Sequence, residues 1–143
     1  MRMVDISAKE EIRRVAEAVG RIELKGETIE AIRRGRVEKG DPLAAAMVAG
    51  IMAAKRTPEL IPLCHPIPLS SVELDFKVGE GFIEARCTVK AEYKTGVEME
   101  ALTGATAALL TIWDMVKYLE KDEEGQYPST RIKEIRVVEK RKG

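Results

Sequence analysis

The sequence has no asparagine, a single glutamine, a single histidine and only two cysteines. Cys64 and Cys87 lack the CxxC spacing of a metal site, and two cysteines are too few for a disulfide framework. No apolar run approaches the roughly 18 residues that a membrane helix needs. Residues 1–5 lack the apolar stretch of a signal peptide. We therefore expect a cytoplasmic protein with no membrane contact.

The sequence also has no excess of charge of either sign, because it contains 24 Lys and Arg residues and 24 Asp and Glu residues. This balance argues against general nucleic-acid binding, which needs a basic surplus, but it allows a local basic pocket for a phosphorylated small molecule. The length of 143 residues and the hydrophobic share of 45% predict one domain, residues 1–143. Few amides beside 34% charged residues are typical of a protein from a thermophile.

The first third of the chain predicts a strand and helices. Residues 10–19 fit a short helix or an extended lead-in, and a strand-like alternation starts after them. Residues 27–34 predict a short helix that ends at Gly35. Asp41 and Pro42 begin a longer helix through Lys55, since Asp caps helices and Pro fits the first turn. This helix is rich in small residues, which is compatible with ordinary tight packing or with close approach of another chain.

A hairpin follows. Residues 72–78 alternate apolar and charged side chains, which is the pattern of a half-buried strand. Residues 79–81 supply a glycine turn, and residues 83–93 repeat the alternation, so the two strands are antiparallel. Cys87 falls on the apolar face, where we interpret it as a core residue.

The last part predicts a long helix and a strand. Thr95 and Glu98 have the spacing of a capping box before a helix whose apolar residues recur to Leu119. Residues 132–138 predict a final strand. The order strand, helices, strand, strand, helix, strand predicts an α+β fold. It is the ferredoxin-like split βαβ sandwich, an antiparallel sheet with helices on one face.

The histidine lies in a stiff loop. Pro62, Pro66 and Pro68 exclude a helix and a central strand there, and they restrict the segment around His65. Histidine exchanges protons near neutral pH, so His65 is a candidate site residue. Two alternatives are a structural histidine that bonds to backbone and a metal site shared with Cys64. Adjacent residues rarely turn to one ion, and there is no second histidine to complete a ligand set.

Charged residues suggest further sites. Lys39 precedes a helix N-terminus, where anions bind, although most such lysines are solvated. Asp114 and Lys117 are three residues apart on one helix face, as a surface ion pair or as an acid/base pair. Glu98 and Glu100 suit the start of the long helix electrostatically.

The spacing along the long helix restricts the site. Glu100 and Asp114 are fourteen residues apart, about 21 Å along a straight helix. Both carboxylates cannot easily contact the reacting centre of one small ligand. We therefore hypothesise a pocket at a subunit interface.

Six segments together resemble the cyclic pyranopterin monophosphate synthase family, in one order along nearly the whole chain. The long segment that starts at Lys94 is the most specific. The segments are Met3-Val4-Asp5-Ile6-Ser7, Lys39-Gly40-Asp41, Ala53-Ala54-Lys55-Arg56-Thr57, Leu63-Cys64-His65-Pro66, Lys94-Thr95-Gly96-Val97-Glu98-Met99-Glu100-Ala101-Leu102-Thr103 and Trp113-Asp114-Met115-Val116-Lys117.

The resemblance implies a lyase of molybdenum cofactor biosynthesis. The implied substrate is (8S)-3′,8-cyclo-7,8-dihydroguanosine 5′-triphosphate, and the implied products are cyclic pyranopterin monophosphate and diphosphate. It further implies a ferredoxin-like subunit in a homohexamer, a trimer of dimers with a pocket between subunits. It implies no resident cofactor, and whether Mg²⁺ accompanies the triphosphate stays open. An inert nucleotide-binding oligomer on the same scaffold is the alternative.

The resemblance also assigns site residues by position. It implies catalytic roles for Asp114, Lys117 and Lys39. It implies that substrate-binding positions are Leu63, Cys64, His65, Met99, Glu100, Glu98, Arg14 and Lys140. The chain stops soon after Lys140, where family members often carry a longer tail.

Overall fold

The computed structural model describes residues 1–143 as four strands and four helices. In chain order they are β1 (Ile12–Glu23), α1 (Gly26–Arg33), α2 (Pro42–Lys55), α3 (Thr57–Leu60), β2 (Leu69–Val78), β3 (Phe82–Tyr93), α4 (Glu98–Glu120) and β4 (Arg131–Lys142). None of these helices combines the length and the apolar character that crossing a membrane requires.

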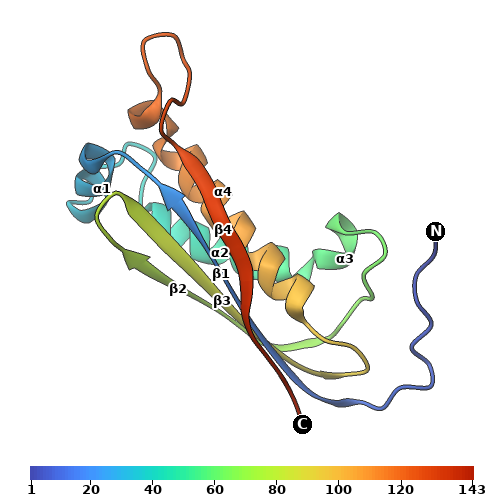
Figure 1. Ribbon diagram of the computed structural model, residues 1–143. Helices are drawn as coiled ribbons and strands as arrows, with labels where there is room; N and C mark the ends of the chain where they lie inside the picture. The colour runs from blue at the N-terminus through green and yellow to red at the C-terminus, as the bar shows by residue number, and fades with distance from the viewer.

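The strands form one antiparallel sheet in the order β2-β3-β1-β4. The helices α2 and α4 pack on one face of this sheet, and no helix covers the other face (Figure 1). The predicted α+β fold, a ferredoxin-like sandwich with helices on one face, is confirmed. The predicted hairpin is also confirmed, because β2 and β3 are joined by residues 79–81 and pair along their length.

The core lies between the sheet and α4. On β3, alternate residues from Ile83 to Ala91 are at most 2% exposed, and they face the buried side of α4 around Leu109 and Ile112. Cys87 is one of these β3 residues, and burial raises the pKa of its thiol to about 12. Cys87 is therefore a core residue, as the alternation predicted.

The start of the chain decides between the two alternatives for residues 10–19. They are extended and not a helix, since β1 begins at Ile12 and runs to Glu23. It lies between β3 and β4, and it has buried residues on both faces of the sheet. Ala16 and Ala18 are buried on one face, and Val15 and Val19 are buried on the other. Burial on both faces removes the alternation that would have identified a strand. The final strand is longer than the predicted 132–138, because β4 continues its pairing with β1 to Lys142.

One of the two predicted caps is present. Asp41 accepts hydrogen bonds from the backbone N–H groups of Leu43 and Ala44 at 3.0 and 3.2 Å, which confirms it as the cap of α2. The capping box at Thr95 and Glu98 is wrong. The helix α4 begins only at Glu98, without a side-chain cap. The side chain of Glu98 lies over Gly96, where it would clash with a Cβ atom.

The small residues of α2 allow close contact with α4. A Cβ atom at Gly50 would lie 2.9 Å from the carbonyl oxygen of Gly104, and one at Gly104 would lie 2.6 Å from the Sγ atom of Cys87. Backbone therefore meets backbone at this crossing. The close approach that the composition allowed is made by α4 of the same chain.

Candidate functional site

The first part of the candidate site lies near the C-terminal end of α4. The carboxylate of Asp114 lies between two lysines, with Oδ1 3.0 Å from Lys117 Nζ and Oδ2 3.3 Å from Lys39 Nζ. Lys39 also donates a hydrogen bond of 3.1 Å to the backbone carbonyl of Asp114. We call these three residues the lysine–aspartate group. Lys39 comes from the loop between α1 and α2, so the group is more than a pair within one helix.

The charges of this group affect one another. Hydrogen bonds and charge from Lys117, and then from Lys39, lower the pKa of Asp114. In return, the carboxylate of Asp114 raises the pKa of Lys117. At neutral pH the group therefore holds two ammonium groups and one carboxylate. All three side chains are exposed enough to meet a ligand, so the surplus positive charge favours an anion.

The second part lies at the other end of α4. Glu100 is only 2% exposed, and its Oε1 atom has no hydrogen-bond partner. The Oε2 atom of Glu98 is likewise buried and unpartnered, while its Oε1 atom lies 3.4 Å from Lys140 Nζ. Burial raises the pKa of Glu100 and that of the nearby Cys64, whose thiolate the charge of Glu100 also disfavours. We call Cys64, Glu98, Glu100 and Lys140 the glutamate group.

Orphaned buried carboxyl oxygens are uncommon and need an explanation. Two of them in the glutamate group indicate a place where a ligand with hydrogen-bond donors completes the bonding. The ring of a pterin or a guanine has N–H groups of this kind. The buried carboxyl oxygens at one end of α4 therefore suit a ring with N–H donors, and the surplus positive charge of the lysine–aspartate group at the other end suits an anion.

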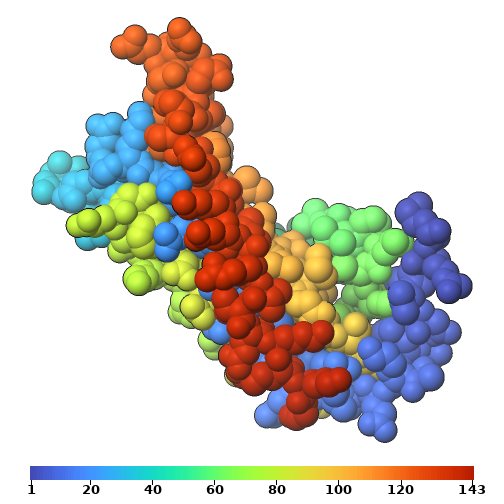
Figure 2. Space-filling view, in the orientation of Figure 1, coloured from blue at the N-terminus to red at the C-terminus, as the bar shows by residue number.

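His65 sits beside the glutamate group in the loop between α3 and β2, which is neither helix nor strand, as its prolines predicted. Its Nε2 atom is 2.6 Å from the backbone carbonyl oxygen of Val4. The N-terminal segment accordingly lies next to this loop in the space-filling view (Figure 2). The alternative of a histidine that bonds to backbone is thus realised in the isolated chain. No sequence signal could have indicated Val4, because the contact is made by its backbone.

The remaining predicted residues surround this end of the molecule. Arg14 is on β1, is 7% exposed, and donates from Nε to the carbonyl of Tyr93 at 3.4 Å. Leu63 and Met99 are 44% and 38% exposed, so both are accessible to a ligand. Lys140 pairs in register with Ala16, two residues after Arg14 on β1, which places Lys140 in this region too.

The two groups do not meet within one chain. α4 is a single helix of 23 residues, and Glu100 and Asp114 are fourteen residues apart on it, about 21 Å along the axis. The structure thus brings Lys39, Asp114 and Lys117 together, and it separates them from Cys64, Glu98 and Glu100.

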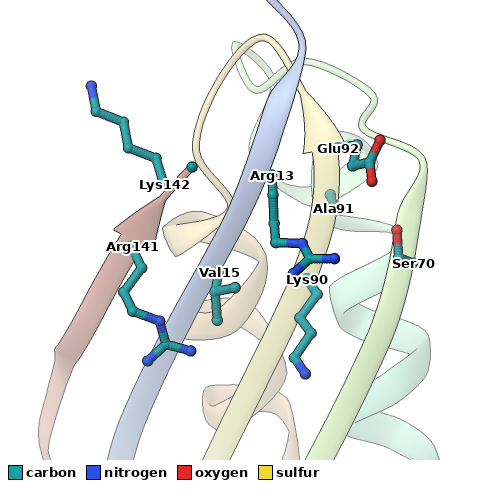
Figure 3. Close-up of a pocket in the computed structure, with 9 residues that line it drawn as sticks. Arg13, Val15, Ser70, Lys90, Ala91, Glu92, Arg141 and Lys142 are labelled. Carbon is teal, nitrogen blue, oxygen red and sulfur yellow. The ribbon is translucent and has the colours of Figure 1, made fainter.

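A cavity of about 470 Å³ lies apart from both groups, on the sheet face that no helix covers, where Arg13, Lys90 and Glu92 are among the residues that line it (Figure 3). None of the predicted site residues lines it. The chain has no group of three or more His, Cys, Asp or Glu side chains placed to hold a metal ion.

Comparisons with known proteins identify the family. The MoaC family matches residues 3–143. A probable cyclic pyranopterin monophosphate synthase of Pyrococcus abyssi is 64% identical over 140 residues, which cover 98% of this chain and 88% of the relative. Proteins of the same description from Thermococcus kodakarensis and Archaeoglobus fulgidus are 63% and 61% identical, each over 100% of this chain and 92% of the relative. The chain belongs to the MoaC family.

Proposed function

We propose that this protein is a cyclic pyranopterin monophosphate synthase of molybdenum cofactor biosynthesis. It converts (8S)-3′,8-cyclo-7,8-dihydroguanosine 5′-triphosphate to cyclic pyranopterin monophosphate and diphosphate. The observation that carries the proposal is the lysine–aspartate group, in which Asp114 lies between Lys39 and Lys117. Membership of the MoaC family and the names of the relatives support it.

The reaction needs cations around a triphosphate and groups that move protons. The cyclic phosphate closes when a hydroxyl attacks the α-phosphorus, the bond from that phosphorus to the leaving diphosphate breaks, and the hydroxyl proton passes to a base. Lys39 and Lys140 neutralise the phosphates. Asp114 and Lys117 move protons at the reacting ring, where Lys117 starts as an ammonium whose pKa Asp114 raises.

The contacts of Asp114 keep its carboxylate ionised. In the free protein the hydrogen bonds of Lys117 and Lys39 lower the pKa of Asp114, so it is ready to accept a proton at neutral pH. Lys39 stays beside Asp114 while its ammonium also neutralises the phosphates.

The complete pocket forms between two copies of the chain. The lysine–aspartate group of one subunit and the glutamate group of another contact the same substrate, which resolves the separation of about 21 Å along α4. In this pocket the ring system is bound by Glu98, Glu100, Cys64 and Arg14. It is positioned by Leu63, His65 and Met99. We propose the homohexamer, a trimer of dimers, as the assembly.

Two substitutions test the catalytic assignment. We expect Asp114→Asn and Lys117→Ala each to lower turnover by about 10²-fold or more, since each removes a proton-transferring group. Conversion of the substrate is followed by mass spectrometry. Lys121→Ala is the matched control, because Lys121 caps the same helix end but takes part in no ion pair. Wild-type turnover in either test variant would refute the role of that residue.

The same assay separates the proposal from the alternative of an inert nucleotide-binding oligomer. Such a protein binds the substrate but forms no cyclic product in any variant.

The assay is repeated with EDTA, because we propose that catalysis needs no resident metal and that Mg²⁺ acts only as a companion of the phosphates. A loss of turnover in EDTA that Mg²⁺ restores is compatible with that role, whereas restoration by Zn²⁺ alone contradicts it.

A further inference from the structure

The loop that carries Lys39 has few attachments to the rest of the fold. It connects the end of α1 at Arg33 to the start of α2 at Pro42. Val37 is its buried residue, at 7% exposed, and Gly40 has a φ of +123°, which a residue with a side chain rarely adopts. Between them Lys39 projects with a side chain that is 45% exposed. A lysine on such a loop needs support if its ammonium is to stay beside Asp114.

Tyr118 supplies this support. Its hydroxyl oxygen accepts a hydrogen bond of 2.8 Å from the backbone N–H of Glu38, the residue before Lys39. Tyr118 follows Lys117 directly and lies four residues after Asp114, so it is on the same side of α4. One turn of the helix thus carries the proton-moving residues and also the attachment point of the loop.

The other end of the α1 segment is attached to the same part of α4. Glu120 is fully buried and accepts hydrogen bonds from the backbone N–H of Lys25 at 3.0 Å, from the Thr28 hydroxyl, and from the Thr130 hydroxyl at 2.6 Å. Lys25 and Thr28 lie at the start of α1. The last turn of α4 therefore holds α1 where it begins, and Tyr118 holds the loop that follows it.

We propose that Tyr118 is a positioning residue that acts through the Glu38 amide to hold Lys39 against Asp114. The inference rests on the proposed function, in which Lys39 and Asp114 are catalytic. The ammonium of Lys39 has two hydrogen-bond acceptors, the carboxylate and the backbone carbonyl of Asp114. Without the hydroxyl, the loop moves more freely and Lys39 spends less time at Asp114.

The variant Tyr118→Phe tests the proposal, since it removes one oxygen atom and keeps the ring. We expect hydrogen exchange at the Glu38 amide to accelerate roughly 5- to 10-fold, the effect of losing one ordinary hydrogen bond. We also expect the pKa of Asp114, followed by carbon-13 NMR of its carboxyl group, to rise. The charged groups that face Asp114 are Lys39 from the loop and Lys117 from α4, and only the contact of Lys39 is weakened.

Turnover supplies the third measurement. We expect kcat to fall about 5- to 10-fold in Tyr118→Phe, with the acid limb of its pH profile moved to higher pH. A role in folding alone would leave that limb in place. Lys39→Gln sets the upper limit of the effects on the pKa of Asp114 and on turnover, because it removes the ammonium itself. Glu38→Gln is the matched control for exchange, since it keeps the backbone donor and its carboxylate makes no hydrogen bond in the structure.

The outcomes are distinguishable. If the Glu38 amide and the pKa of Asp114 are unchanged in folded Tyr118→Phe, the inference is overturned whatever the turnover. If both change as expected while kcat and the pH profile do not, the positioning role in catalysis is also rejected. If the wild-type protein itself makes no product, the proposed function fails, while the two NMR measurements still decide whether Tyr118 holds Lys39.

Discussion

Glu100 is a residue whose position costs stability. Its carboxyl group is almost fully buried, its Oε1 atom has no partner, and burial raises its pKa. A raised pKa means that the protonated form is favoured in the folded protein. The stability that this provides is present below the ordinary glutamate pKa and is lost as pH rises toward the raised value. At neutral pH the buried charge therefore opposes folding.

We predict that Glu100→Gln raises the free energy of unfolding at pH 7 by about 1 kcal/mol, because a buried amide is less costly than a buried carboxylate. The gain disappears at about pH 3, where the carboxyl group is protonated in both states. The same variant loses affinity for the substrate, since the amide cannot accept as the carboxylate does. Denaturant unfolding at the two pH values and a binding titration measure both effects.

Glu98→Gln is the comparison for this prediction. Glu98 has one orphaned oxygen as well, but its other oxygen is paired with Lys140, so its substitution also breaks an ion pair. A Glu100→Gln protein that is less stable than the wild type at pH 7 would show that the carboxylate is satisfied in solution, and the proposed ligand-binding role would lose its physical basis.

At the scale of elements, the crossing of α2 and α4 depends on two glycines. A Cβ atom at Gly104 would come within 2.6 Å of Cys87 Sγ and 3.1 Å of the Gly50 carbonyl oxygen. We predict that Gly104→Ala lowers the free energy of unfolding by about 2 kcal/mol through overpacking. This corresponds to a fall of roughly 4–8 °C in the unfolding midpoint at equal chain concentration, measured by calorimetry.

Gly26→Ala is the matched control, because a Cβ atom there meets nothing within 4 Å at the first residue of α1. It is expected to stabilise slightly, since alanine loses less entropy than glycine in a helix. Cys87→Ala in the Gly104→Ala background removes the closest clashing atom and should recover part of the loss. No recovery would mean that the strain lies between the two helix backbones instead.

Most elements of the fold could be predicted from the sequence where local pattern and tertiary environment agree. The hairpin and α4 are each half-buried, so their periodicity is visible in the chain. β1 is buried on both faces and gave an ambiguous pattern. The capping box at Thr95 and Glu98 was wrong because Glu98 turns toward Lys140 and over Gly96, which is a tertiary arrangement that spacing alone does not reveal.

The candidate site was predictable only in part, for a similar reason. The family motifs picked out Lys39, Asp114 and Lys117, and the structure joins them although Lys39 and Asp114 are 75 residues apart in the chain. Helical spacing also predicted that Glu100 and Asp114 are distant. Tyr118 carries no motif of its own, since its role depends on a backbone amide that folding brings to it.

At the scale of the whole molecule, the proposed shared pocket makes a prediction about mixtures. Asp114→Asn inactivates the lysine–aspartate group, and Glu100→Gln inactivates the glutamate group. In a dimer with one chain of each kind, one pocket combines both defects and the other combines two intact groups. We predict that refolding an equal mixture restores roughly a quarter of the wild-type activity, as random pairing of a two-fold dimer requires.

Each variant alone must stay inactive in this experiment, and mixing without refolding should give a slower recovery that is limited by subunit exchange. The mixture Asp114→Asn with Lys117→Ala is the control, because both substitutions damage the same group and no pocket is repaired. Equal recovery in the two mixtures, or none in either, would contradict a pocket shared in this way. Sedimentation of the wild-type chain measures the assembly independently.

α4 also restricts how this protein can change in evolution. Because one continuous helix carries Glu100 and Asp114, an inserted residue between them moves one carboxylate about 1.5 Å along the axis and turns it by about 100° relative to the other. Substitutions can accumulate there, but insertions and deletions cannot. The stretch from Asp122 to Gln126 carries no candidate site residue, so its length can vary. Length variation among homologues should therefore collect in the turns and leave the 23 residues of this helix unchanged in number.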